Sequence, residues 1–338
     1  MGDVAYWLPL VWAAILAVAV TLYVILDGFG LGLGILFPLA PREERRDVMM
    51  NTIAPFWDGN QTWLVLGGGG LFVAFPKAYG IIMSGLYIPI IVMLLALVFR
   101  GVAFEFRWVA KPKQYIWDLA FSYGAIVAAF AQGVVLGGIL QGIKVEGGQF
   151  AGGALDWLTP FALFCGVGVV SGYALLGTTW LIYKTDGDTQ SWARYKANTA
   201  LLTVVAAMGL ISLWTPFSAP GVWDRWFSWP NVLLLSPVPI LTAIAAFYCW
   251  LGIEDDKSDS KAFVWAIALF LLGLMGLVIS NAPYLVPRSL TVWDAAAAPS
   301  SQMFMLVGTL IMLPIILGYT VFVYWTFRGK VGADTGYH

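Results

Sequence analysis

The sequence predicts an all-α polytopic membrane protein with nine transmembrane helices, and three observations support this fold class. Only 11% of the 338 residues are charged and 60% are hydrophobic, whereas about 25% of the residues in a soluble domain are charged. Apolar runs of the length that crosses a bilayer, about 20 residues, recur from end to end. Backbone polar groups in lipid must be satisfied within their own segment, so runs of this length form helices.

Nine apolar runs are expected to span the membrane. They cover residues 7–37, 50–76, 78–100, 115–142, 158–183, 197–217, 230–252, 262–284 and 301–327. Only Pro76 and Lys77 separate the second run from the third, which predicts a tight hairpin. No loop is long enough to form a soluble domain. The first run lacks a preceding basic region and is too long for a signal peptide, so we interpret it as the first span.

Basic residues are distributed unevenly between the loops. Fourteen of the 18 Lys and Arg residues, including Lys111, follow odd-numbered runs. The four exceptions are Lys77, Lys144, Arg225 and Arg288. Cytoplasmic loops carry the excess of basic residues, so the N-terminus is predicted to be periplasmic and the C-terminus cytoplasmic. This orientation requires an odd number of spans, which independently supports nine.

Ionisable residues within the runs need a physical reason, because a charge at mid-membrane costs about 2.5–3.5 kcal/mol. At 1.5 Å per residue, Asp27 lies about 15 Å from the cytoplasmic end of the first run, and Asp58 about 12 Å into the second. Arg100 ends the third run, and Glu105 follows just beyond it. These residues are therefore all expected in the cytoplasmic half of the bilayer.

Two interpretations of these polar residues remain open. Asp58, Gln61 and Thr62 share a helix face, because they are spaced at i, i+3 and i+4. In the structural interpretation, Asp58 or Asp27 pairs with Arg100 and locks the helices together. In the functional interpretation, these groups form part of a proton or ion route from the cytoplasm. Either way, such a polar stripe must face other helices or water rather than lipid.

Glycines are concentrated in the first two runs. "DGFGLGLG" contains Gly28, Gly30, Gly32 and Gly34, and "GGGG" covers residues 67–70. Small residues on a membrane helix allow another helix to approach closely, so both stretches predict close helix packing. Neither is expected to bind a nucleotide, because each lies within a span and no strand precedes it.

The chain offers few side chains for redox or hydrolytic chemistry. Cys165 and Cys249 lie within apolar runs, where they are expected to be small buried residues. The only histidine is His338, the last residue. Bis-histidine haem ligation, His-based metal sites and Ser-His-Asp catalysis are therefore excluded for this chain. If the protein serves redox chemistry, a partner must hold the cofactors. A net charge of −1 gives no indication of nucleic-acid binding.

Four stretches together resemble subunit II of the cytochrome bd-type quinol oxidases. They are "LDGFGLGLGILF", "NTIAPFWDGNQTWLVLGGGGLFVAFP", "LYIPIIVMLLALVFRGVAFEFR" and "GYALLGTTWLIYKTDG", in this order. The resemblance covers most of the chain and is strongest over residues 20–110. The short loops and the "ILFP" ending of the first run favour the branch often called cyanide-insensitive oxidase.

The resemblance implies the arrangement of the helices and the nature of the partner. Spans 1–4 (residues 1–142) and 5–8 (residues 158–284) would form two four-helix bundles, with a peripheral ninth helix at 301–328. Subunit I would carry two haems b, one haem d and the quinol site, whereas this chain would bind no cofactor. The complex, a quinol:O2 oxidoreductase of the bacterial inner membrane, would reduce O2 to water with cytoplasmic protons. Lipid, quinone and a small single-span accessory subunit are further implied partners.

Residue roles follow from the matching motifs. Asp58 matches the aspartate of the family's WDGNQ motif, near a proton route, and Trp57 and Trp63 match its two tryptophans, the second near a lateral oxygen access. Asp27 matches the first aspartate of a DGFD motif, and Arg100 matches the arginine that closes the third span. The expected proton path or structural polar cluster comprises Asp58, Asp27, Arg100, Gln61 and Glu105.

One position departs from the family pattern. The second acid of DGFD is replaced by Gly30 in this chain. A role that requires two carboxylates in the first span is therefore in doubt here.

Three functions are weighed on this basis. The first is an oxidase subunit that stabilises subunit I and helps to form its proton or oxygen path. The second is a secondary transporter that uses the intramembrane Asp27 and Asp58. The third is a scaffold that only stabilises its partner. The acids all lie toward one membrane face rather than at the midplane, which argues against a transporter. The faint similarity between the two halves of the chain argues against it as well.

Overall fold

The computed structural model describes residues 2–110, 113–219 and 221–332. Lys111 and His338, on which two of the expectations above rest, lie outside these ranges. The longer helices are α1 (Gly2–Leu36), α3 (Trp57–Ala74), α5 (Tyr87–Val109), α6 (Gln114–Gln141), α7 (Pro160–Lys184), α8 (Gly187–Ser218), α11 (Pro237–Glu254), α12 (Ser260–Asn281) and α13 (Pro299–Thr326). Shorter elements connect them: η1 (Phe37–Leu39), α2 (Glu43–Asn51), α4 (Pro76–Gly85), α9 (Val222–Phe227), α10 (Asn231–Leu235), and the hairpins β1 (Val145–Glu146) with β2 (Gln149–Phe150) and β3 (Tyr284–Val286) with β4 (Leu290–Thr291).

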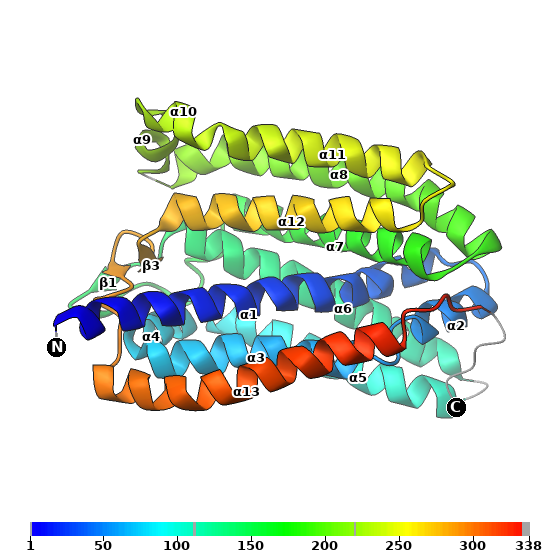
Figure 1. Ribbon diagram of the computed structural model, residues 1–338, viewed down its shortest axis with the longest axis horizontal. Helices are drawn as coiled ribbons and strands as arrows, with labels where there is room; N and C mark the ends of the chain where they lie inside the picture. Colours follow the sequence, from blue (N-terminus) through cyan, green and yellow to red (C-terminus); the bar gives the residue numbers. More distant parts are fainter. Residues whose placement is uncertain (1, 111–112, 220, 333–338) are drawn as a thin grey trace.

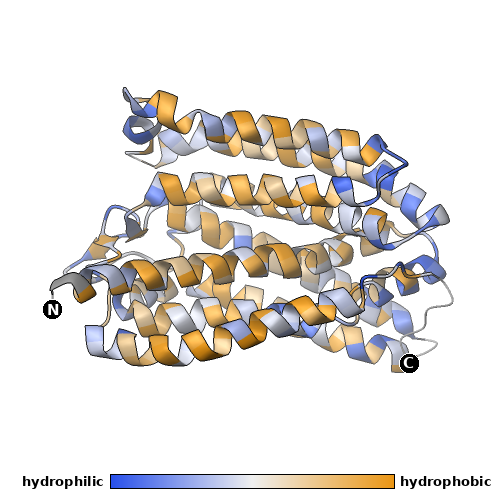
Figure 2. Ribbon diagram, viewed as in Figure 1, coloured by the Kyte–Doolittle hydropathy of each residue, from blue (hydrophilic) through white to orange (hydrophobic). Residues whose placement is uncertain are grey.

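The all-helical membrane fold is confirmed. Among the described residues, eight helices are long and apolar enough to cross a bilayer, or nine if the bent pair α3 and α4 is one span. The long helices run side by side (Figure 1). Hydrophobic residues line most of their length, whereas hydrophilic residues gather at the two ends (Figure 2). This distribution is what a bilayer-spanning bundle requires, because only the helix ends meet water and headgroups.

Helix α1 lies at the centre of the packing. It contacts α3, α6 and α7, and α5 packs on α6. Helix α7 continues the assembly, because it also contacts α6, α8 and α12, while α11 packs on α12 and α8. Helix α13 contacts α1 and α3 at the edge of the molecule (Figure 1). The start of α1 and the end of α13 lie at opposite ends of the helix axes (Figure 1).

The predicted third span, 78–100, is wrong in both position and form. Helix α3 ends at Ala74, and Pro76 begins the short helix α4, which is bent by 120° from α3. Helix α5 then starts at Tyr87 and continues to Val109. The apolar run conceals this break because hydropathy alone does not register a change of helix direction. Arg100 therefore lies inside a helix rather than at its end, and the expected hairpin at Pro76 is replaced by a bend followed by a second turn at Leu86.

The predicted start of the second span, near residue 50, is also wrong. Residues 43–51 form the separate helix α2, and α3 begins only at Trp57. Pro55 lies in the intervening turn, and it has no backbone N–H with which to continue a helix. Asp58 is therefore the second residue of α3 rather than a residue 12 Å deep in a helix. A carboxylate in the first turn is favoured by the positive end of the helix dipole.

A buried lysine joins the end of α13 to α7. Lys184, the last residue of α7, has only 2% of its surface exposed. Its Nζ donates hydrogen bonds to the carbonyls of Phe327 and Gly329, each at 2.5 Å. The backbone N–H of Val331 donates in return to the Lys184 carbonyl at 2.8 Å. The segment after α13 is therefore attached to the end of α7.

The same segment carries a second anchor at its surface. Lys330 Nζ forms ion pairs with Asp186, next to the end of α7, and with Asp259, before α12. Partial burial disfavours the charged form of this lysine, but the two carboxylates outweigh it and raise the pKa of Lys330. An exposed pair of this kind adds little stability by itself. Lys184 is thus the more important of the two anchors.

Replacing Lys184 with methionine is expected to release the segment after α13. The variant loses two charge-assisted hydrogen bonds, and each contributes about 1.5–3 kcal/mol. We expect a lower thermal midpoint for the subunit and faster proteolysis after residue 326. Lys257→Met is the matched control, because Lys257 is exposed at the same end of the molecule. Equal protease sensitivity in wild type and Lys184→Met would show that this lysine does not hold the segment.

Candidate functional site

The glycines of α1 bring three other helices against it. A Cβ on Gly28 would lie 2.9 Å from the Tyr173 ring, and a Cβ on Gly32 would lie 1.9 Å from the Tyr173 carbonyl oxygen. These two glycines therefore receive α7. A Cβ on Gly30 would lie 2.7 Å from an Arg100 guanidinium nitrogen, and one on Gly34 would lie 2.3 Å from the Ala125 Cβ. These two face α5 and α6. Close packing is confirmed for all four glycines of this stretch.

The glycine run of α3 behaves differently along its length. A Cβ on Gly70 would approach Leu16 of α1 to 2.6 Å, and one on Gly67 would approach Val20 to 3.6 Å. Cβ atoms on Gly68 and Gly69 would meet nothing within 4 Å. The predicted close packing therefore holds for one side of this run only. Its other side is a smooth open surface.

Asp27 and Arg100 form a fully buried ion pair. Asp27 has 0% of its surface exposed and Arg100 has 1%. The guanidinium Nη1 lies 2.8 Å from Asp27 Oδ1 and donates to Oδ2 at 3.1 Å. The sequence left open whether Asp27 or Asp58 would meet Arg100, and the structure selects Asp27. A Cβ on Gly30 would come within 2.7 Å of a guanidinium nitrogen, so this glycine leaves room for Arg100 beside Asp27.

The motif WDGNQTW is divided between two faces of α3. Asn60 and Trp63 point inward, with 3% and 1% of their surfaces exposed. Asn60 Nδ2 donates to the carbonyl of Leu26 on α1 at 2.8 Å, and its Oδ1 accepts from Tyr324 of α13 at 3.0 Å. Asp58 is exposed on the opposite face of the helix. Sequence reasoning did not single out Asn60, although an amide among apolar residues was a usable signal.

The other predicted site residues do not join the buried pair. Trp57 is half-buried, and its ring is tilted against that of Phe104 on α5, with centroids 5.1 Å apart. Gln61 is half-buried, and its Nε2 has no hydrogen-bond partner in the described chain. Glu105 is exposed on α5. The expected cluster of five polar residues is therefore one closed pair, Asp27 with Arg100, and three separate groups nearer the surface.

Trp63 lies beneath α13 rather than at a free surface. Its ring belongs to a buried group with Ala19 and Tyr23, and Leu313 and Leu317 of α13 cover this group. A lateral oxygen access at this tryptophan would therefore have to open between α1, α3 and α13.

A second charged cluster ties α2 to α5 and α6. Arg107, which is fully buried, contacts Asp47 at 2.5 Å through Nη1 and Asp118 at 2.6 Å through Nε. Arg46 completes the cluster at 2.9 Å from Asp118. Arg107 follows the third apolar run in the sequence, but it lies within α5, which extends to Val109, and not in a loop. The spacing of Arg100 and Arg107, two helical turns apart, was the available signal.

The acidic and cysteine side chains of the described residues are spread over separate helices and loops. Within the described ranges, no group of three His, Cys, Asp or Glu side chains could hold a metal ion. Cys165 and Cys249 are both buried on separate helices, as predicted. The Cys249 thiol lies 3.5 Å from the carbonyl of Ala262, to which it donates. Both cysteines therefore act as packing residues.

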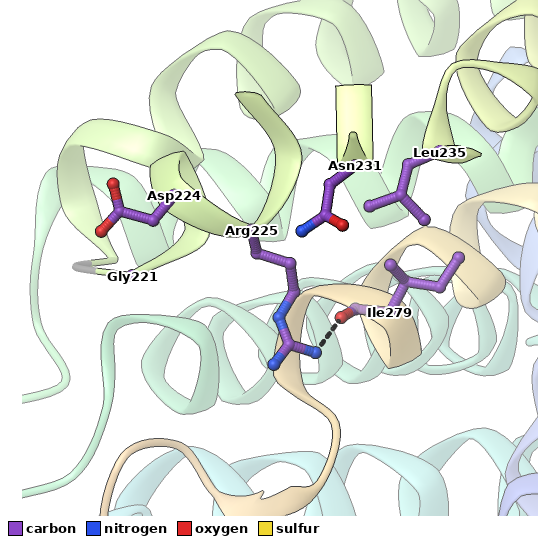
Figure 3. Close-up of a pocket in the computed structure, with 6 residues that line it drawn as sticks. All are labelled: Gly221, Asp224, Arg225, Asn231, Leu235 and Ile279. Carbon is purple, nitrogen blue, oxygen red and sulfur yellow. Dashed lines mark hydrogen bonds between the residues drawn. The ribbon is translucent and has the colours of Figure 1, made fainter. Parts of the chain in front are cut away.

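A cavity of about 500 Å³ lies at the other end of the molecule. Its lining residues are Gly221, Asp224, Arg225, Asn231, Leu235 and Ile279. Arg225 extends toward α12 and donates to the carbonyl of Ile279 at 2.9 Å (Figure 3). None of the predicted site residues lines this cavity. It is therefore separate from the polar groups around α1.

Comparisons with known proteins agree with one another. The family model described as "Cytochrome bd terminal oxidase subunit II" matches residues 8–327. The chain is 28% identical over 361 residues to "Cytochrome bd-I ubiquinol oxidase subunit 2" of Escherichia coli K12, covering 96% of this chain and 95% of that protein. It is 29% identical over 330 residues to "Cytochrome bd ubiquinol oxidase subunit 2" of Bacillus subtilis, covering 95% and 96%.

A solved structure shares the fold. The bd oxidase from Geobacillus thermodenitrificans contains a chain that superposes with a TM-score of 0.79 at 17% identity, covering 95% of this chain and 98% of that one. At this level of identity the match supports the fold alone.

Proposed function

The chain belongs to the cytochrome bd terminal oxidase subunit II family, and from this premise we propose how its polar residues serve the oxidase. As a member of this family, it is a multi-span protein of the bacterial inner membrane and a subunit of an oxidoreductase complex. The match over residues 8–327 carries this conclusion. It decides against the secondary transporter, because the relatives that align along nearly the whole chain are oxidase subunits.

In the proposed complex, this chain holds no haem. The relatives' names give ubiquinol as the electron donor, so the reaction is oxidation of a quinol and reduction of O2 to water. Two haems b, one haem d and the quinol site are assigned to subunit I. The buried, separated cysteines and the lack of a ligand cluster in the described ranges support this division. Haem would supply electron transfer and O2 binding, while this chain orders polar groups beside it.

The proposed topology has a periplasmic N-terminus and a cytoplasmic C-terminus. Spans in 1–142 and 158–284 form two four-helix bundles, and the helix within 301–328 is peripheral. Three findings support this arrangement: the basic-residue asymmetry, the opposite ends reached by the start of α1 and the end of α13, and the few contacts of α13. In this topology, the Arg107 cluster lies at the cytoplasmic side and the cavity of Figure 3 at the periplasmic side.

Subunit I is proposed to cover the outer face of α3. Five exposed residues recur there at helical spacings of four and three: Asp58, Thr62, Val65, Gly69 and Phe72. Val65 is 71% exposed, and the glycine leaves a smooth surface for a neighbouring helix. A carboxylate and a hydroxyl on a lipid-facing helix would be costly. A partner helix on this stripe would give both groups polar neighbours.

Asp58 and the buried pair would then have different roles. Asp58, with Gln61 and Glu105 beyond it, lies at the proposed subunit boundary, where protons from the cytoplasm would reach subunit I. Asp27 and Arg100 form an internal polar site behind it. Oxygen access near Trp57 and Trp63 remains a further proposal. So does contact with lipid, quinone and a small single-span accessory subunit.

Asp58→Asn is expected to slow proton uptake and lower quinol oxidation by about tenfold or more, because an amide cannot exchange a proton. Haem content should stay near the wild-type value, since Asp58 makes no ion pair within the described chain. Stopped-flow proton uptake and oxygen consumption per haem measure this. Glu146→Gln, an exposed acid on β1, is the control. If activity per haem is unchanged and only assembly fails, Asp58 is a docking residue and carries no protons.

A further inference from the structure

The cavity of Figure 3 lies where the apolar helices end, and α9, α10 and α12 contribute its walls. Two consecutive residues of α9 fasten this short helix to the last turn of α12. Arg225 Nη1 donates to the Ile279 carbonyl at 2.9 Å, and Trp226 Nε1 donates to Ser280 Oγ at 2.9 Å. Helix α9 also contacts α8 and α10. The cavity therefore lies between elements that are bonded to one another.

Exposed aromatic side chains on and beside α9 indicate the depth of the cavity in the membrane. Trp223, Phe227 and Trp229 have 51%, 53% and 76% of their surfaces exposed. Tryptophan rings gather at the level of the lipid headgroups, because they combine an apolar body with a polar edge. Leu233 and Leu234 of α10 are exposed as well. The cavity is therefore placed at headgroup level, with apolar surface for lipid chains next to it.

Arg225 brings to this cavity a positive charge that the protein does not balance. Lys144, in the loop before β1 at the same end of the molecule (Figure 1), pairs with Asp156 at 3.5 Å. Among the described residues, by contrast, no carboxylate lies within 4 Å of Arg225, and only its Nη1 donates a hydrogen bond. The half-buried guanidinium therefore keeps donors for an anion. Its planar fork matches two oxygens of a phosphate.

Asp224 adds a negative charge to the same cavity. Its carboxylate is exposed and points away from Arg225 (Figure 3). No lysine or arginine in the described part of the chain lies within 4 Å of this carboxylate. The cavity thus presents one cation and one anion that do not neutralise each other. A zwitterionic headgroup is complementary to this pattern, since its phosphate would meet Arg225 and its ammonium would meet Asp224.

We propose that this cavity binds the headgroup of phosphatidylethanolamine, a phospholipid that carries a phosphate and a primary ammonium. Arg225 donates to the phosphate, and Asp224 accepts from the ammonium. Leu235 and Ile279, the apolar part of the lining, contact the lipid beside its headgroup. A primary ammonium donates hydrogen bonds to a carboxylate, whereas the quaternary ammonium of phosphatidylcholine has no proton to donate. None of the proposed proton-path residues lines the cavity, so the lipid site does not depend on the proposed function.

The test measures where a lipid binds to the purified, assembled complex and how tightly it binds. A photoactivatable phosphatidylethanolamine is cross-linked to the complex in detergent, and the labelled peptide is mapped. We expect labelling within residues 221–235. Unlabelled phosphatidylethanolamine should compete at up to about fivefold lower concentration than phosphatidylcholine, as one exposed ion pair allows. Inorganic phosphate at the same concentration should not compete, because it lacks the apolar chains.

Two variants separate the two charges of the site. Arg225→Gln should weaken the binding of both lipids by about tenfold, because it removes charge-assisted hydrogen bonds to the phosphate. Asp224→Asn should abolish the preference for phosphatidylethanolamine and leave phosphatidylcholine binding unchanged. Because Asp224 is exposed, this second variant also serves as the test if Arg225→Gln does not assemble.

Lys144→Gln is the matched control, since it removes an exposed basic residue at the same end of the molecule. It should bind both lipids as the wild type does. The lipid site is disproved if the wild type is not labelled within residues 221–235, or if Arg225→Gln is labelled like the wild type. It is also disproved if Lys144→Gln weakens binding equally, if Asp224→Asn keeps the lipid preference, or if inorganic phosphate competes as well as the lipids.

Discussion

Gly32→Ala is expected to prevent α7 from packing on α1, and the complex should then fail to assemble. A Cβ at this position would lie 1.9 Å from the Tyr173 carbonyl oxygen and within 3 Å of the Gly177 backbone. Backbone atoms cannot rotate away as a side-chain end can, so the two helices would have to separate. Separation would also break the contact of Tyr173 with Gly28 and its hydrogen bond to Gln132. Gly177 faces Gly32 across the contact, so Gly177→Ala should have the same effect.

Assembly is measured as the yield of haem-containing complex on a native gel and by size-exclusion chromatography. Gly209→Ala is the control, because Gly209 lies within α8 and a Cβ there would meet nothing within 4 Å. That variant should assemble normally, since alanine is favoured over glycine in a helix by up to about 1 kcal/mol in water. A wild-type yield of Gly32→Ala would show that the α1–α7 contact is looser than described here.

The spans were predictable from the sequence because lipid leaves the backbone few choices. The long apolar runs had to be helices, and the alternating glycines of α1 had to be close contacts. The bend after α3 was not predictable from hydropathy, since a run that changes direction keeps the same composition. The start of α3 depended on Pro55 and its turn. Asp58 consequently moved from mid-helix to the first helical turn.

The sequence identified the residues of the polar site better than it identified which of them contact each other. Asp27, Arg100 and Asp58 were all singled out, but helical periodicity does not specify which neighbour each helix face will meet. In the structure α5 packs so that Arg100 meets Asp27, next to the space that Gly30 leaves. Asn60 was missed, although an amide among apolar residues was a usable signal of a buried polar contact.

Arg100→Gln is expected to destabilise the subunit strongly, because it leaves the Asp27 carboxylate buried without a counter-charge. Breaking a buried ion pair by removing one partner costs about 3–5 kcal/mol. Asp27→Asn should cost a similar amount, since it strands the guanidinium instead. The thermal midpoint of the purified complex should fall in both variants. Arg42→Gln is the control: Arg42 pairs with Asp188 at 3.6 Å with 70% of its side chain exposed, and such surface pairs contribute at most about 1 kcal/mol.

The double variant Asp27→Asn with Arg100→Gln distinguishes the two roles of this pair. Two neutral amides leave no unpaired charge, and replacing both partners of a buried ion pair is often nearly neutral for stability. The thermal midpoint should therefore recover most of the loss seen in each single variant. Proton uptake should not recover, because neither amide can take up or release a proton near neutral pH. Recovery of stability alone would assign the pair to proton handling, whereas recovery of both properties would make Asp27 and Arg100 a structural lock between α1 and α5.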